Sequence, residues 1–93
     1  MDETGFTRHA RVRLQQRAIP YEAVDIVVGF GRMRRHGRAD VFSLDRRARK
    51  AVRDDLGENA YRDIEPRLDI YVVMGRDGRV VTVAHRTERM RNA

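Results

Sequence analysis

Apolar residues recur at helical spacing near the N-terminus. They stand four positions apart and share one face of a helix: Phe6, Ala10, Leu14 and Ala18. Thr7 can accept hydrogen bonds from the first free backbone N–H groups, and Pro20 cannot donate into a continuing helix. The pattern predicts one helix between these two residues.

A second helix is predicted to follow at once. Pro20 suits the first helical position, and apolar residues cover most of the surface over 23–30. Such a surface favours burial against a sheet. Gly29 and Gly31 are expected to end this helix, so that the two helices form a compact pair.

A first hairpin is predicted in the middle of the chain. Its strands cover 32–36 and 41–44, joined by a turn over 37–40. The first strand is polar and basic enough to be an edge strand or a strand that faces a substrate.

A third helix is predicted over 46–56, where apolar residues recur at helical spacing. Ser43 or Asp45 is expected to cap it, and Gly57 to end it. We expect residues 58–67 to form a connecting loop.

The strongest strand signal comes last in the chain. Two β-rich runs, 69–76 and 79–85, flank an Asp-Gly dipeptide at 77–78, which is typical of two-residue hairpin turns. Such a turn places Val73 opposite Thr82 and predicts two faces. One face should lie on the helices: Ile70, Val72, Met74, Val81 and Val83. The other should form a shallow open surface: Tyr71, Val73, Gly75, Val80, Thr82 and Ala84.

Together these elements predict a single α+β domain over 1–93. An N-terminal helix pair packs on a small antiparallel sheet of about four strands, with an extra helix between the middle strands. Ninety-three residues suffice for a core that folds alone but not for one that encloses a deep cavity.

Charge narrows the range of partners. The net charge is +6, and the 20 cations include a single lysine, Lys50. This bias can reflect genomic base composition, yet guanidinium groups also offer forked donors that suit phosphate and stack on bases. Acidic partners are therefore favoured, whether RNA, DNA or an acidic protein segment.

Several other classes of protein are disfavoured, because the sequence lacks the residues that they require. Cysteine is absent, which excludes disulfides and thiolate metal sites, and the three histidines have no metal-ligand spacing. We expect no metal and no cofactor. Since the chain has no apolar run long enough for a bilayer and no signal peptide, a cytoplasmic location is expected.

A titratable basic stripe borders the apolar face of the first helix. His9, Arg13 and Arg17 are four residues apart, so they rise along one side of the helix. An imidazole and two permanent cations therefore border the core. They are the first candidates for a functional site.

The ordered pattern of the chain resembles a known family. His9-Ala10-x-x-Arg13-x-x-x-Arg17-x-Ile19 is followed by a Val-rich helix that ends in Gly and by a terminal Val-Thr-Val at 81–83. This resembles a bacterial domain of unknown function that is grouped with the RelE-like and barnase–colicin type ribonuclease folds. The segment over 45–67 departs from that pattern, since it is longer and more helical than expected.

The resemblance implies a basic concave surface that cleaves RNA without metal. It implies a toxin restrained by an antitoxin, or an effector domain. Such cleavage needs a base for the 2′-OH proton, an acid for the leaving 5′-oxygen and donors for the phosphate. The 2′-OH is the nucleophile, so DNA would be spared.

Residues can be assigned to these roles. His9 is the first choice for base or acid, and Arg13 and Arg17 would hold phosphate. His85 would supply the second proton-transfer group if it comes near His9, and Thr82 would contact phosphate or the 2′-oxygen. The expected RNA contacts outside this catalytic set are Arg34, Arg35, Tyr71 and Arg86.

Structural interpretations stay open for each of these residues. His9 and His85 can be packing residues, and Arg13 and Arg17 can pair with Asp25, Asp69 or Glu22. His36 fits a solvated loop or an RNA-contacting strand better than a catalytic site. The rival hypotheses for the whole chain are a non-catalytic module that binds RNA or an acidic protein, and a purely structural domain.

Overall fold

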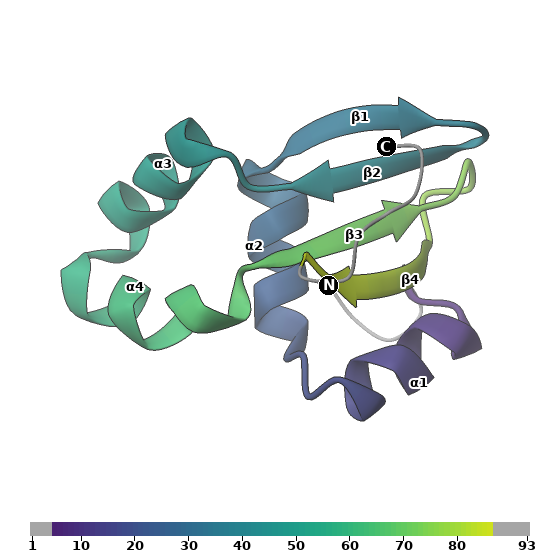
Figure 1. The fold of residues 1–93 in the computed structure, drawn as a ribbon, viewed down its shortest axis with the longest axis horizontal. Helices are drawn as coiled ribbons and strands as arrows, with labels where there is room; N and C mark the ends of the chain where they lie inside the picture. Colours follow the sequence, from purple (N-terminus) through teal and green to yellow (C-terminus); the bar gives the residue numbers. More distant parts are fainter. Residues whose placement is uncertain (1–4, 87–93) are drawn as a thin grey trace.

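Four helices and a four-stranded antiparallel sheet form the described part of the chain, residues 5–86, in the computed structural model (Figure 1). The strands lie in the order β1-β2-β3-β4, so each one pairs with its neighbour in sequence. The elements are α1 Arg8–Gln16, α2 Tyr21–Phe30, β1 Arg32–His36, β2 Ala39–Ser43, α3 Arg46–Leu56, α4 Glu58–Ile64, a 3₁₀ helix Glu65–Arg67, β3 Ile70–Met74 and β4 Val80–His85. The predicted α+β class is confirmed.

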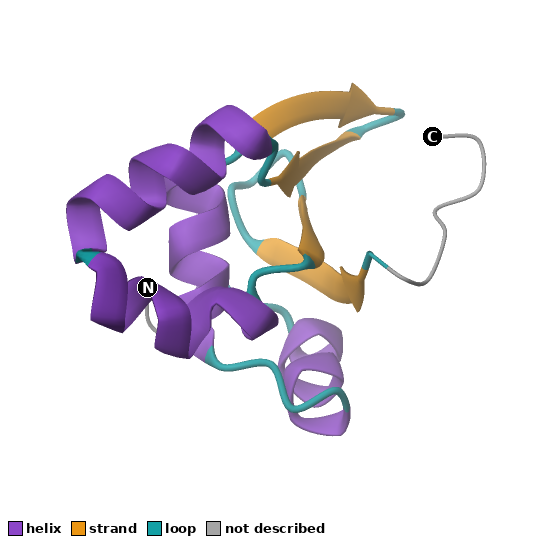
Figure 2. Ribbon diagram, turned by 60° about the vertical axis from the view of Figure 1, so that its left-hand side comes forward, coloured by secondary structure: helices purple, strands orange, loops and turns teal. Residues whose placement is uncertain are grey.

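The helices gather on one side of the sheet (Figure 2). α2 packs on β2 and β3, α1 packs along β4, and α3 contacts both α2 and α4. Within residues 5–86 no helix covers the other face of the sheet, which we call the open face. No helix of this part combines the length and the apolar character that crossing a membrane requires.

Thr7 joins the start of α1 to the edge of the sheet. Its hydroxyl accepts a hydrogen bond from the Ala10 backbone N–H at 3.1 Å and donates one to the Val81 carbonyl oxygen at 3.1 Å. Its own backbone N–H donates to the Val80 carbonyl oxygen at 2.9 Å. The predicted cap is confirmed, and it also fixes where α1 lies on β4.

The end of α1 differs from the prediction. The helix stops at Gln16, because Ala18 adopts a left-handed conformation with φ 54°. The Ile19 backbone N–H then donates back to the Leu14 carbonyl oxygen at 2.9 Å, which is a common way to close a helix. As a result Ile19 is buried in the core and Ala18 is exposed, so the apolar stripe ends one turn early.

α2 is shifted slightly from its predicted bounds. Pro20 is the N-cap and not the first helical residue. Gly29 lies inside the helix, and Gly31 alone ends it, with its N–H on the Val27 carbonyl oxygen at 2.8 Å. The predicted burial is confirmed, because four side chains of α2 are buried: Ala23, Val24, Ile26 and Val27.

The first hairpin has a tighter turn than predicted. Only Gly37 and Arg38 form the turn, so Ala39 and Asp40 belong to β2. Gly37 has φ 63°, a conformation that glycine adopts without steric cost. β1 is an edge strand with all five residues exposed, as its polarity indicated.

The segment after β2 is more helical than predicted. α3 has its predicted bounds, with the Asp45 side chain accepting from the Ala48 N–H at 2.8 Å. The prediction of a loop over 58–67 is wrong, because α4 and the 3₁₀ helix fill that range. Tyr61 and Ile64 pack on the core from α4, a spacing of three that is typical of one helix face.

The last hairpin keeps its predicted register except near the turn. Val73 lies opposite Thr82 and Ile70 opposite His85, but Met74 lies opposite Val80. The turn is one residue longer than predicted, and a β-bulge at Val81 restores the register. The predicted faces of two residues are therefore reversed, since Val80 is buried and Val81 is exposed.

Two glycines near the end of α2 should respond to alanine in opposite ways. A Cβ at Gly31 would overlap the Val27 carbonyl oxygen and lie 2.9 Å from that of Ser43, so G31A should destabilise the fold by about 1–3 kcal/mol. A Cβ at Gly29 meets nothing within 4 Å, so G29A should stabilise the helix by about 0.5–1 kcal/mol. Urea unfolding monitored by circular dichroism measures both. Equal effects of the two substitutions would contradict the observed end of α2.

Candidate nucleic-acid interface on the open face of the sheet

Alternation along β1 places three basic residues on one face. Successive strand residues point to opposite sides, so Arg32, Arg34 and His36 share a face. This face is the open face. Arg34 lies opposite Val41, Val41 lies opposite Val73, and both valines lie outside the main cluster of buried core residues. The edge strand therefore supplies the open face with two guanidinium groups and an imidazole.

These residues border a small pocket of about 170 Å³. Its walls come from three strands, β1, β2 and β3, and from the residue after β4: Arg32, Arg34, His36, Val41, Ser43, Tyr71 and Arg86. The pocket thus combines permanent cations, an imidazole, a hydroxyl and an aromatic ring. We call it the open-face pocket.

Arg86 is held in place at the edge of this pocket. Its backbone N–H donates to the Asp69 carbonyl oxygen at 2.9 Å, and its Nη1 donates to the Leu44 carbonyl oxygen at 2.9 Å. The same Nη1 lies 3.7 Å from the Asp69 carboxylate. Its guanidinium carbon lies 5.7 Å from the centroid of the Tyr71 ring. These contacts fix a cation over an aromatic face.

The cations of β1 are held more loosely. Arg32 lies 3.9 Å from the Asp45 carboxylate, and both side chains are largely exposed, so solvent and salt screen this pair. Within residues 5–86, Arg34 and His36 form no hydrogen bond or ion pair through their side chains. Both are exposed and able to bind a ligand.

Arg35 lies on the opposite face from the other predicted RNA contacts. The alternation of β1 directs it away from Arg34, and its Nε lies 3.0 Å from the Asp40 carboxylate oxygen. The structure thus brings Arg34, Tyr71 and Arg86 to one pocket. It separates Arg35 from them.

The basic stripe of α1 lies elsewhere. His9 is exposed, whereas Arg13 and Arg17 are partly buried. Arg13 has its Nε buried without a hydrogen-bond partner. Arg11 lines a groove between α1 and α2. At 100° per residue, His9, Arg13 and Arg17 lie on the other side of α1, away from this groove. None of the three borders the open-face pocket.

His85 and Thr82 are separated by the pleat of β4. Thr82 lies on the open face opposite Val73, whereas His85 lies opposite the buried Ile70. The ring Nε2 of His85 lies 3.3 Å from the Arg17 carbonyl oxygen, to which its N–H tautomer donates. His85 is therefore fixed against the end of α1.

The two predicted proton-transfer residues are not brought together. α1 and β4 run in the same direction, because Thr7 contacts Val80 and Arg17 contacts His85. His9 stands eight residues before Arg17, which is about 12 Å along a helix axis. His9 and His85 thus lie near opposite ends of α1.

Sequence reasoning did not place Arg32 or Ser43 at the site, and it considered His36 only for a solvated loop or an RNA-contacting strand. The signal was present, since Arg, Arg and His stand at alternate positions of one predicted strand. Grouping Arg34 with its neighbour Arg35 obscured it, because adjacent strand residues face opposite ways. Ser43 was considered only as a helix cap, and Asp45 is the cap.

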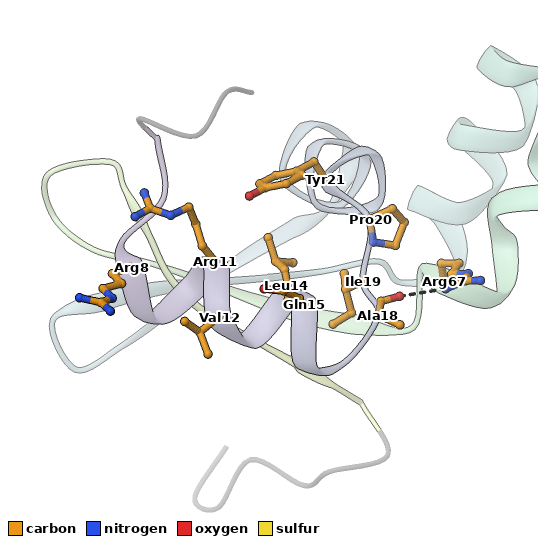
Figure 3. A pocket seen from close by; sticks show the side chains of 10 residues that line it. All are labelled: Arg8, Arg11, Val12, Leu14, Gln15, Ala18, Ile19, Pro20, Tyr21 and Arg67. Carbon is orange, nitrogen blue, oxygen red and sulfur yellow. Dashed lines mark hydrogen bonds between the residues drawn. The ribbon is translucent and has the colours of Figure 1, made fainter.

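A second hollow lies between α1 and α2 (Figure 3). This groove has a volume of about 840 Å³ and an apolar floor that includes Leu14 and Ile19. Arg8 and Arg11 stand at its rim, and Arg67 closes one end with a 2.8 Å hydrogen bond to the Ala18 carbonyl oxygen. The groove offers no imidazole and no carboxylate for proton transfer.

Comparison with protein-family models, curated proteins and solved structures gives no match for this chain. The resemblance to RelE-like ribonucleases therefore stays a prediction. Among residues 5–86 no group of three or more His, Asp or Glu side chains is placed to hold a metal ion. The functional argument depends on the geometry of the open-face pocket.

Alanine substitutions of His85 and His9 should distinguish a histidine that stabilises the fold from one that is exposed and does not. H85A removes the hydrogen bond to Arg17 and should lower the free energy of unfolding by about 1 kcal/mol. H9A removes an exposed side chain and should change it by less than about 0.5 kcal/mol. Chemical denaturation measures both values. Equal destabilisation by the two substitutions would contradict the placement of His85.

Proposed function

We propose that the protein binds single-stranded RNA on the open face of its sheet. The observation that carries this proposal is the Arg86–Tyr71 pair beside Arg32 and Arg34 in one pocket. This pocket combines the two elements of single-strand recognition, which are a surface on which bases stack and cations that bind the backbone.

The guanidinium groups supply the phosphate contacts. Arginine presents forked donors that match phosphate oxygens in a bidentate manner. Arg34 has no competing carboxylate in the described chain, and Arg32 has only a distant, exposed one. A phosphate can therefore bind there without displacing a strong ion pair.

The Tyr71–Arg86 pair supplies the stacking surface. Arg86 is fixed by Leu44 and Asp69, so little conformational entropy is lost when a base stacks on its guanidinium plane. The strand-walled site on an exposed sheet face also favours splayed single-stranded bases. Recognition of a DNA duplex typically needs a helix or a two-stranded ribbon inserted into the major groove.

Adjacent arginines of β1 offer a matched test of this binding. R34Q removes a pocket cation and should weaken binding of a single-stranded RNA about five- to ten-fold at low salt, where phosphate contacts are strongest. R35Q removes an equal charge on the other face, beside Asp40, and should leave affinity within about two-fold. Fluorescence anisotropy with a labelled oligonucleotide measures both. Equal losses would show that only net charge matters.

A second candidate function is metal-independent RNA cleavage, as the resemblance implies. It is favoured by the position of His36, an imidazole in the same pocket as three guanidinium groups. His36 would accept the 2′-OH proton while the 2′-oxygen attacks phosphorus and the P–O5′ bond breaks. The products are a 2′,3′-cyclic phosphate and a 5′-hydroxyl end, protonated from solvent. Because the resemblance also implies an antitoxin, we propose that a cognate antitoxin protein restrains this activity.

Cleavage in EDTA distinguishes the two histidine sites. If the open-face pocket is catalytic, H36Q abolishes production of 2′,3′-cyclic phosphate ends from RNA, whereas H9A retains it. Gel analysis of a labelled RNA, with a DNA of the same sequence as control, measures the products. Loss in H9A alone would assign catalysis to the α1 stripe with Arg13 and Arg17. Binding without any cleavage would favour the non-catalytic module.

A further inference from the structure

A second basic surface lies on α3. Four cations at i, i+3, i+4 and i+7 share one helix face: Arg46, Arg49, Lys50 and Arg53. They lie opposite Ala48 and Val52, which are buried. The row extends about 10 Å along the helix. It belongs to the segment that departs from the RelE-like pattern.

A hollow of about 970 Å³ lies against this face. Tyr61 lines it from α4, and the guanidinium carbon of Arg53 lies 5.9 Å from the centroid of the Tyr61 ring. This is the same type of pair as Arg86 on Tyr71, at 5.7 Å. The α3 surface thus repeats the combination of cations and a stacking surface.

The two basic surfaces meet at one residue. Arg86 lines both the open-face pocket and the α3 hollow. Its guanidinium is bonded to the Leu44 carbonyl oxygen, directly before the Asp45 cap of α3. Figure 1 shows α3 next to the end of the sheet where β2 finishes. A ligand can therefore pass from one surface to the other without crossing an uncharged gap.

Carboxylates neutralise only part of the α3 surface. Arg49 contacts Glu65 at 3.7 Å and Asp69 at 3.2 Å, and Lys50 forms an exposed pair with Asp54 at 3.2 Å. Within residues 5–86 no carboxylate pairs with the other two cations of this face, Arg46 and Arg53, or with Arg47, which also lines the hollow. The Asp45 carboxylate lies in the hollow and is engaged as the helix cap.

We propose that α3 is the second half of the RNA-binding surface. This inference rests on the proposed function. A single-stranded RNA anchored at the open-face pocket continues past Arg86 onto α3. There Arg46 and Arg53 bind phosphates, and a base stacks on the Arg53–Tyr61 pair. The substrate is accordingly a strand of several nucleotides, and short oligonucleotides occupy only the first half of the surface.

The dependence of affinity on RNA length tests this inference. Fluorescence anisotropy compares a labelled trinucleotide with a labelled dodecamer of uridine. The double variant R46Q/R53Q should weaken dodecamer binding about ten-fold and leave trinucleotide binding within about two-fold. The slope of log K against log salt for the dodecamer should fall by about 1.4, which is 0.7 for each lost phosphate contact.

A control variant removes the same charge elsewhere. R8Q/R76Q changes the start of α1 and the turn between β3 and β4, which lie at the other end of the molecule from α3 (Figure 1). Its affinity for both oligonucleotides should stay within about two-fold of the wild type. R34Q should weaken the binding of both lengths, because both are anchored at the open-face pocket. Far-UV circular dichroism checks that each variant is folded.

Several outcomes would overturn the inference. If R46Q/R53Q weakens both lengths equally, or no more than R8Q/R76Q does, α3 is not a specific path for RNA. Tighter binding of a polyglutamate peptide than of the dodecamer would assign α3 to an acidic protein. These results leave RNA binding at the open-face pocket intact. If the wild type binds neither oligonucleotide, the proposed function itself fails, and the inference with it.

Discussion

The contacts of Arg86 join the parts of the molecule on which the site depends. One guanidinium group donates to the carbonyl oxygen of Leu44 just after β2, lies near the carboxylate of Asp69 before β3, and covers the ring of Tyr71 within β3. Charge-assisted hydrogen bonds of this kind are stronger than neutral ones. They hold a cation on the open face at the point where the sheet meets α3, so both basic surfaces depend on this residue.

The exposure of the open face has a simple origin in the sequence. On the helix-covered side of the last hairpin the strands present large apolar residues such as Ile70 and Val72, whereas β1 presents arginine and histidine to the open face. Helices bury the apolar side because burial of apolar area is the main favourable term in folding. The basic residues stay in water, where a phosphate can reach them. The fold and the proposed function thus follow from one alternating pattern.

The sequence predicted the elements whose signals are local and periodic. The Thr7 cap, the bounds of α3 and the pairing of Val73 with Thr82 depend on spacing alone, and the structure confirms them. The bulge at Val81 and the left-handed Ala18 were not predictable, because each is set by how distant segments pack. The open-face pocket was predicted only in part for the same reason. It needs the register of three strands and the position of Arg86, which no single segment specifies.

A titration followed by two-dimensional ¹H–¹⁵N NMR tests the central claim most directly. The backbone amides of the labelled protein report where a single-stranded RNA dodecamer binds at low salt. Binding at the open face predicts shifts concentrated in β1, around Tyr71 and at Arg86, with further shifts in α3. Shifts confined to α1 and to the groove between α1 and α2 would contradict the account, as would the absence of any shift.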